Sequence, residues 1–205
     1  MSIKNTDFKE EKFDFGRMFG FAYGEKENGA VFSHMAVMYA NALYKRGFIK
    51  EGYKVLKNLL DSAMDFESSI MYPGIPEYFD NDGRGLYAYL TGAASWYMLT
   101  MITEVFGVRG ELGNLVIKPA LLPEQFDKDG KAAIKLNFSG RTLKITIHAD
   151  IDNIQDNNGV YNKIIRVECD GNELESADLK KVVIMKKRIE EMSCGRCHEI
   201  DVFIK

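Results

Sequence analysis

Three residues in the first half of the chain have the side chains that an anion site needs. His34 opens one long apolar-periodic segment, and Thr91 and Gly92 open another. Both segments are predicted to be helices, and a helix N-terminus presents unpaired N–H groups and the positive end of its dipole. An imidazole, a hydroxyl and a glycine that allows close backbone approach suit a phosphate. His34, Thr91 and Gly92 are therefore predicted to bind phosphate.

Two acids lie in the loops before these helices and could contact a sugar. Glu27 precedes an Asn-Gly turn, and Glu77 lies in a loop rich in proline, glycine and aromatic residues. Carboxylates accept hydrogen bonds from sugar hydroxyls, while rings cover the apolar faces of a sugar. The candidate rings are those of Tyr72, Tyr78 and Tyr89.

Each candidate residue taken singly also has a purely structural explanation. A histidine at a helix start is more often a satisfied structural residue, and a threonine at an N-cap needs no ligand. A loop glutamate is more often a solvated charge. Only the combination of the two helix starts favours a ligand site.

Three helices are predicted in the first half of the chain. The first is capped by Ser33 and ends at Lys45-Arg46-Gly47, and the second covers about Lys50 to Asp65 and has a polar side. The third covers about Gly92 to Phe106 and is apolar on nearly its whole circumference. The succession of inner, outer and inner helices predicts an α/α toroid whose two inner helices run parallel and begin on one face.

Beyond Gly107 the hydrophobic pattern changes to period two. Asp-Gly, Ser-Gly and Asn-Asn-Gly turns separate the strand-like segments, and Leu143, Ile145 and Ile147 alternate with polar residues. The predicted fold is therefore α+β, with residues 1–109 as the C-terminal part of an α/α toroidal barrel and residues 110–205 as a small antiparallel β-sandwich-like domain. The predicted strands are NLVIKP, AAIKLNFSG, TLKITIHADI, NKIIRVECDGNEL, KKVVIMKKR and EIDVFIK.

Composition and charge exclude several classes of partner. The net charge of −3 provides no basic field for nucleic acid. Residues 85–103 carry no charge and could span a bilayer by length, but their Thr, Ser and Gly content favours a buried helix over a membrane segment. The start of the chain has no signal-type apolar core, and three cysteines do not make a disulfide framework. A cytoplasmic location is predicted.

The segment CGRCH, Cys194 to His198, has the pattern of c-type haem attachment. Haem attachment needs an exported chain, and no second pair of ligands has the spacing of a zinc site. A surface turn is the favoured interpretation over haem or zinc. No metal and no cofactor is predicted, and the role of Cys194 and Cys197 stays open.

Several motifs together resemble the inverting β-glucoside phosphorylases, the cellobiose and cellodextrin phosphorylase group. The resemblance covers about Phe15 to Phe126, with a lean toward the cellodextrin type, and implies an α/α barrel followed by a small β domain. By position it implies that His34, Thr91 and Gly92 contact phosphate and that Glu27 binds hydroxyls of the transferred glucosyl unit. Glu77 falls about where the family has a polar residue of that subsite. The motifs are KENGAVFSH, YPGIPEYF, GRGLYAYLTGAASW, YLTGAASWYMLTMITEVFGVRG and GNLVIKPAL.

The implied reaction is phosphorolysis of a β-linked gluco-oligosaccharide to glucose 1-phosphate, with inorganic phosphate as co-substrate and no other cofactor. Phosphate attacks the anomeric carbon with inversion while a general acid protonates the leaving oxygen; as an anion, phosphate needs no base. The family's general acid is an upstream aspartate, and nothing in residues 1–24 resembles its segment, so no catalytic residue is expected in this chain.

The chain is therefore expected to be a C-terminal fragment of such a phosphorylase. It would need the missing N-terminal barrel portion or self-association, and the parent is expected to be a homodimer. The alternative, from a different class, is a non-catalytic carbohydrate-binding or structural fragment, or a split subunit without activity of its own. Chain-length and linkage preference are not determined.

Overall fold

The computed structural model describes residues 13–72, 74–88, 92–149, 163–174 and 180–205. The chain divides into two compact units, Met1–Thr100 and Met101–Lys205. The sequence placed the domain boundary later, between residues 109 and 110. In the described part, no helix is both long and apolar enough to cross a membrane.

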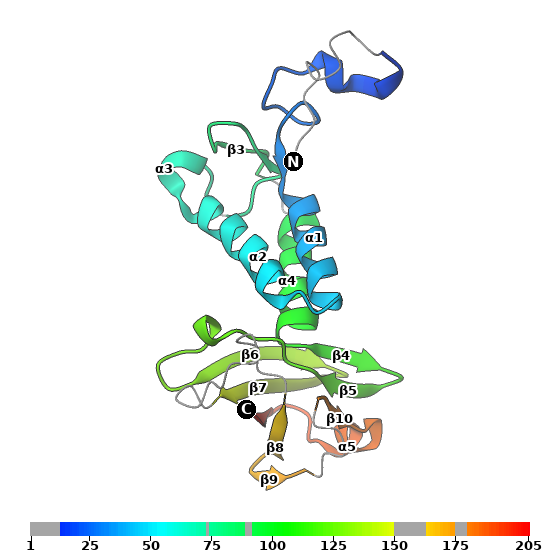
Figure 1. Ribbon diagram of the computed structural model, residues 1–205. Coiled ribbons are helices and arrows are strands. Elements are labelled where there is room, and N and C mark those ends of the chain that lie inside the picture. The colour runs from blue at the N-terminus through cyan, green and yellow to red at the C-terminus, as the bar shows by residue number, and fades with distance from the viewer. Residues whose placement is uncertain (1–12, 73, 89–91, 150–162, 175–179) are drawn as a thin grey trace. The chain divides into compact units, whose positions relative to one another are not determined.

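The first unit is built on three packed helices, of which α1 contacts both α2 and α4 (Figure 1). α2 buries Leu56, Leu59 and Ala63 on one side, as its amphipathic pattern predicts. A small antiparallel sheet in the order β1-β2-β3 contacts α1 through β1 and β2. The elements are the 3₁₀ segment η2 (Phe13–Gly20), β1 (Val31–Phe32), α1 (Ser33–Lys45), α2 (Ile49–Met64), α3 (Phe66–Ser69), β2 (Tyr78–Phe79), β3 (Gly85–Leu86) and α4 (Gly92–Thr100).

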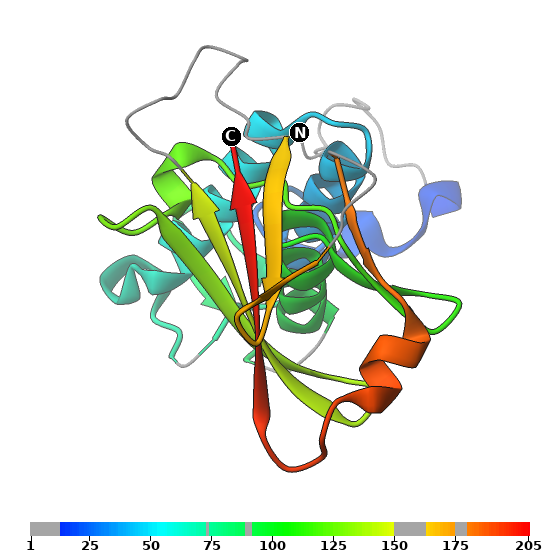
Figure 2. The same ribbon diagram turned by 90° about the horizontal axis from the view of Figure 1, so that it is seen from below.

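The second unit contains a three-stranded sheet in the order β10-β5-β4 and a five-stranded sheet in the order β6-β7-β11-β8-β9. Figure 2 shows β11 between β7 and β8, parallel to the first and antiparallel to the second. The elements are the π-helix η3 (Met101–Val105), β4 (Val108–Glu111), β5 (Asn114–Ile117), the 3₁₀ turn η4 (Pro123–Gln125), β6 (Lys131–Phe138), β7 (Arg141–Ala149), β8 (Ile164–Cys169), β9 (Asn172–Glu173), β10 (Val182–Ile184), α5 (Lys186–Glu191) and β11 (Cys197–Ile204).

The core of the second unit follows the period-two pattern. Leu143, Ile145 and Ile147 of β7 are fully buried, and the residues between them point to the other face of the sheet. The predicted Ser-Gly turn joins β6 to β7, with Ser139 and Gly140 both at positive φ, which suits the right-handed twist of a hairpin. The predicted Asn-Asn-Gly turn lies outside the described residues.

The α/α toroidal barrel predicted from the sequence is wrong. The described residues form a mixed α/β structure of five α-helices and three sheets. The second unit is also not purely antiparallel, because β7 and β11 pair in parallel. α4 packs on α1, but its Met98 and Leu99 are exposed, so the described residues do not enclose this helix as a barrel would.

The predicted third helix changes its geometry part-way. α4 ends at Thr100, and η3 continues the coil as a π-helix up to Val105. Glu104 is buried there and is paired with the Arg109 guanidinium, whose Nε also donates to the Thr103 carbonyl at 2.8 Å. A buried carboxylate needs such a partner, so the pair fastens η3 to β4.

Candidate functional site

The N-terminus of α1 is attached directly to the small sheet. Ser33 is the first helical residue instead of the predicted N-cap, and the N-cap residue Phe32 makes no side-chain capping bond. The Ser33 N–H donates to the Glu77 carbonyl at 2.9 Å, which continues the β1–β2 pairing into the helix. The Glu77 backbone therefore lies beside the start of α1.

The N-termini of α1 and α4 meet through His34 and Gly92. A Cβ built at position 92 would lie 2.6 Å from His34 Nδ1 and 2.7 Å from its Cε1, so the imidazole occupies the space that the glycine leaves. Further along, Asn41 Nδ2 donates to Thr100 Oγ1 at 3.1 Å. The two contacts, one at each end, show that the helices run parallel and start together.

Two polar side-chain atoms of consecutive residues at the start of α1 have no hydrogen-bond partner among the described residues. His34 Nε2 and Ser33 Oγ are shielded from solvent, and neither makes a hydrogen bond in the described part of the chain. The His34 ring also packs against Trp96, at 5.8 Å between ring centroids. A buried polar group without a partner costs about 1–3 kcal/mol, so both atoms are suited to accept or donate a hydrogen bond to a ligand.

Among the described residues, no other predicted site residue has a side chain that makes a hydrogen bond to His34 Nε2. Thr91 lies outside the described residues. The Glu27 carboxylate accepts a hydrogen bond from the Arg17 guanidinium, with Arg17 Nε 2.9 Å from Glu27 Oε1. This hydrogen bond lowers the pKa of Glu27. The Glu77 N–H donates to the carbonyls of Leu86 and Tyr87, at 3.1 and 3.0 Å. The structure thus joins the Glu77 backbone to the α1 start, while the Glu27 carboxylate is engaged by Arg17.

A row of aromatic rings extends from the start of α1. Phe32 lies 5.5 Å from Tyr78, Tyr78 lies 5.7 Å from Tyr87, and Lys26 Nζ lies 4.4 Å from the Tyr87 ring centroid. Tyr78 is buried, which raises its pKa, whereas Tyr87 is partly exposed. Sequence reasoning missed Lys26 and Tyr87, whose only signal was their place in loops beside the predicted acids. Exposed rings with nearby polar groups suit a sugar.

The other predicted rings do not join this row in the described part of the chain. Tyr72 is largely exposed and meets Phe66 edge-on, at 5.0 Å between centroids. Tyr89 lies outside the described residues. Tyr78 is therefore the predicted ring that the structure places near His34, through Phe32.

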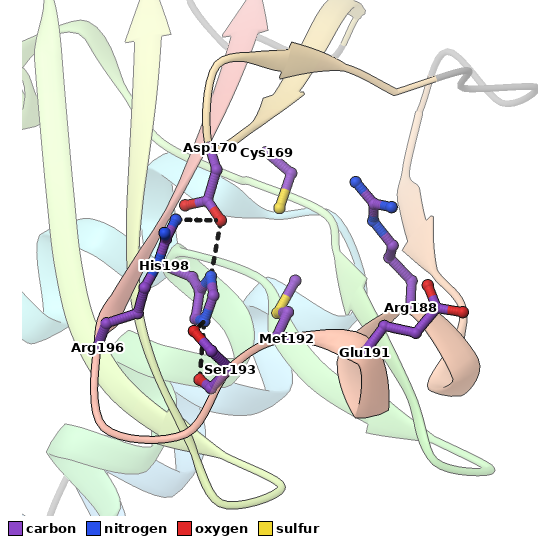
Figure 3. A pocket seen from close by; sticks show the side chains of 8 residues that line it. All are labelled: Cys169, Asp170, Arg188, Glu191, Met192, Ser193, Arg196 and His198. Atoms are coloured by element: carbon purple, nitrogen blue, oxygen red, sulfur yellow. Dashed lines mark hydrogen bonds and ion pairs between the residues drawn. The ribbon is translucent and has the colours of Figure 1, made fainter.

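The second unit contains a pocket of about 290 Å³ (Figure 3). Asp170, from the turn after β8, accepts a hydrogen bond from His198 Nδ1 at 2.7 Å. Its carboxylate also forms an ion pair with the Arg196 guanidinium at 2.7 Å. His198 is buried, and its Nε2 lies 3.0 Å from the Ser193 carbonyl oxygen. The lining residues are Cys169, Asp170, Arg188, Glu191, Met192, Ser193, Arg196 and His198.

The histidine of this pocket, His198, lies between a serine, Ser193, and an aspartate, Asp170, as in a catalytic triad. The hydrogen bonds, however, are not those of a triad. Ser193 Oγ is 3.5 Å from His198 Nε2, whereas the Ser193 carbonyl is closer, at 3.0 Å. A carbonyl only accepts, so Nε2 must carry a proton and cannot act as base toward the hydroxyl. With Nδ1 also facing a carboxylate, His198 acts as a clamp between Asp170 and the segment before β11. We name this arrangement the Asp170–His198 clamp.

The Cys-x-x-Cys-His segment forms the turn that leads into β11. Cys194 and Cys197 are exposed free thiols, and both ring nitrogens of His198 are engaged by the clamp. No group of three potential metal ligands occurs among the described residues. His198 could reach a metal only if the clamp opened.

The clamp should make stability depend on pH in the acid range. Burial alone would raise the pKa of Asp170, but hydrogen bonds from His198 and the Glu199 N–H and the charges of His198 and Arg196 outweigh it, so the pKa is lowered. Stability from this group is therefore fully present above the unfolded pKa of about 3.9 and is lost as the pH falls through the lower folded value.

We therefore expect Asp170→Asn to have a lower free energy of unfolding than the wild type at pH 6. The gap between the two free energies should narrow as the pH falls below about 4. Urea unfolding at a series of pH values measures the gap. A gap that stays constant down to the lowest pH would contradict the ionic role of Asp170.

Comparison with known proteins shows a distant similarity to a named protein. No family model matches the chain. Over 147 residues the chain is 26% identical to cellobionic acid phosphorylase of Neurospora crassa, a match that covers 65% of this chain and 18% of that protein. The similarity supports a distant relationship to a glycoside phosphorylase. The match thus spans less than a fifth of the length of this relative.

Proposed function

We propose that this chain forms part of a glycoside phosphorylase and supplies some of the residues that bind phosphate. The observation that carries the proposal is the pair of buried, unpartnered atoms, His34 Nε2 and Ser33 Oγ, where two parallel helices begin. Helix N-termini attract anions through their free N–H groups and their dipoles. The distant similarity to a phosphorylase supplies the reaction class in which such an anion is a substrate.

In this proposal His34, Thr91 and Gly92 hold inorganic phosphate, and no other cofactor is used. Phosphate is already an anion, so the site needs to position it against the anomeric carbon and to offset its charge. His34 Nε2 donates to one phosphate oxygen, and the N–H groups at the starts of α1 and α4 complete the contact. The general acid comes from another part of the active protein.

The sugar lies beside the phosphate, along the aromatic row. Glu27 and Glu77 are proposed to accept hydrogen bonds from the glucosyl unit, for which Glu27 must exchange its contact with Arg17. We propose a β-linked gluco-oligosaccharide of the cellobiose or cellodextrin type as the substrate class. Cellobionic acid, from the name of the relative, is a further candidate.

Phosphate titration of the chain, followed by NMR of the three histidine rings, tests the phosphate site. At constant ionic strength, we expect the His34 ring signals to shift and saturate, while those of His148 and His198 stay in place. Both of the latter are already held by carboxylates, at 2.6 and 2.7 Å. His34→Ala is expected to weaken phosphate binding at least about tenfold, a loss of about 1.4 kcal/mol.

The matched control is His148→Ala, which removes a histidine from the second unit and should leave phosphate binding unchanged. Chloride at the same ionic strength separates phosphate binding from general screening. Equal shifts of all three histidines, or none at His34, would remove the basis of the proposal.

A further inference from the structure

Cys194 and Cys197 flank a short turn in the second unit. Both thiols are exposed and free, and only Gly195 and Arg196 separate them. Gly195 has φ +87°, a conformation that lets the chain reverse tightly between the end of α5 and β11. The turn thus places two accessible thiols three positions apart at the surface.

The clamp holds this turn from both sides. The residue before Cys194 is Ser193, whose carbonyl accepts from His198 Nε2 at 3.0 Å. The residue before Cys197 is Arg196, whose guanidinium pairs with Asp170 at 2.7 Å. Figure 3 shows Asp170, His198 and Ser193 in one line with Arg196 beside Asp170. One Asp–His pair therefore fixes both ends of the segment that carries the two thiols.

The third cysteine provides an internal contrast. Cys169 lines the pocket but is buried, and burial raises the pKa of its thiol. The thiolate is the reactive form, and a buried thiol of raised pKa reacts slowly. Exposure therefore separates Cys194 and Cys197 from Cys169 as sites of thiol chemistry.

We propose that Cys194 and Cys197 form a reversible thiol–disulfide pair that exchanges with low-molecular-weight disulfides such as glutathione disulfide. One thiolate attacks a glutathione sulfur, forms a mixed disulfide and releases one glutathione thiolate. The second thiolate then attacks the protein sulfur of that mixed disulfide and releases the second glutathione. In total, two protein thiols are oxidised and one glutathione disulfide is reduced to two glutathione molecules.

The pair is coupled to the pocket through the clamp. Closing the disulfide draws Cys194 toward Cys197, which moves the neighbouring Ser193 and Arg196, and both of these line the pocket. A change in the redox state of the turn therefore changes the surroundings of His198 and the shape of the pocket wall. This inference concerns the second unit and does not depend on the proposed phosphate site.

Equilibration in glutathione buffers tests the pair directly. The protein is quenched with acid, alkylated and analysed by intact and peptide mass spectrometry. We expect the Cys194–Cys197 disulfide to exceed mixed disulfides at least about tenfold, because the second thiol is delivered within the same turn. Cys194→Ser and Cys197→Ser are each expected to give a stable mixed disulfide, whereas Cys169→Ser should behave like the wild type.

The coupling has its own readout. Oxidation is expected to shift the ring signals of His198 and to leave those of His34 and His148 unchanged. Asp170→Asn, verified as folded by circular dichroism, should lower the yield of intramolecular disulfide at a fixed glutathione ratio, because it loosens the turn. Mixed disulfides alone, disulfides between chains, a disulfide to Cys169, or an unchanged His198 signal would each overturn the proposal.

Discussion

Gly107→Ala is expected to destabilise the second unit by at least about 3 kcal/mol, because the added methyl group meets fixed backbone atoms. Gly107 has φ +67°, and a Cβ there would lie 1.7 Å from the Lys118 carbonyl oxygen and 2.2 Å from its carbon. Those atoms belong to the backbone and cannot rotate away. The Lys118 N–H also donates to the Gly107 carbonyl at 3.0 Å, so the clash breaks a contact that holds η3 against the end of β5.

Gly140→Ala is the matched control for the clash. Gly140 has a similar φ of +74°, but a Cβ there meets nothing within 4 Å. It therefore carries the backbone strain alone, which is about 1–2 kcal/mol for an alanine in this region. Urea unfolding of both variants measures the difference. Equal losses in the two variants would show that strain, and not the contact with Lys118, makes glycine necessary at position 107.

Gly92→Ala is expected to weaken phosphate binding at least about tenfold, equivalent to about 1.4 kcal/mol, while the chain stays folded. The new methyl group would lie 2.6 Å from His34 Nδ1, so the imidazole must leave its place between the two helix starts. A side-chain ring can move at modest cost, about 1–3 kcal/mol of stability. The expected effect thus falls mainly on the ligand that His34 is proposed to hold.

Gly52→Ala separates this effect from crowding in general. A Cβ at position 52, in the first turn of α2, lies equally close to a ring, 2.6 Å from Cδ2 of Tyr44, but this contact is at the C-terminal end of α1 and not at the start where His34 lies. Both variants should lose similar stability, and only Gly92→Ala should lose phosphate affinity in the titration. If Gly52→Ala weakens phosphate binding as much, the effect comes from helix packing and not from His34.

Local features of the structure were predictable from the sequence. α1 and α2 lie close to their predicted bounds, because amphipathic periodicity and the Lys45-Arg46-Gly47 stop are local signals. The Ser-Gly hairpin and the buried face of β7 follow from turn chemistry and from the alternation of Leu143 and its neighbours. The adjacency of His34 and Gly92 also agrees with the expectation that two parallel helices begin together.

Other features were not predictable, because they depend on which segments meet. α5 was missed, since its first three residues, Lys186 to Arg188, were counted as the end of a strand. Ser33 was taken for a cap, but the pairing of β1 with β2 draws the helix start to Glu77. The contact of Glu27 with Arg17 was also not predictable, because it depends on η2 bringing the guanidinium within hydrogen-bond distance of the carboxylate.

By itself the sequence determined the approximate bounds of α1, α2 and β7, because periodicity, glycine turns and basic helix ends act within a few residues. Only the tertiary structure decided the layers that bury those elements, the parallel pairing of β7 with β11 and the Asp170–His198 clamp. The physical reason is the same for all three. Each depends on hydrogen bonds and packing between segments distant in the chain, and the hydrophobic pattern of a segment does not record which segment it will meet.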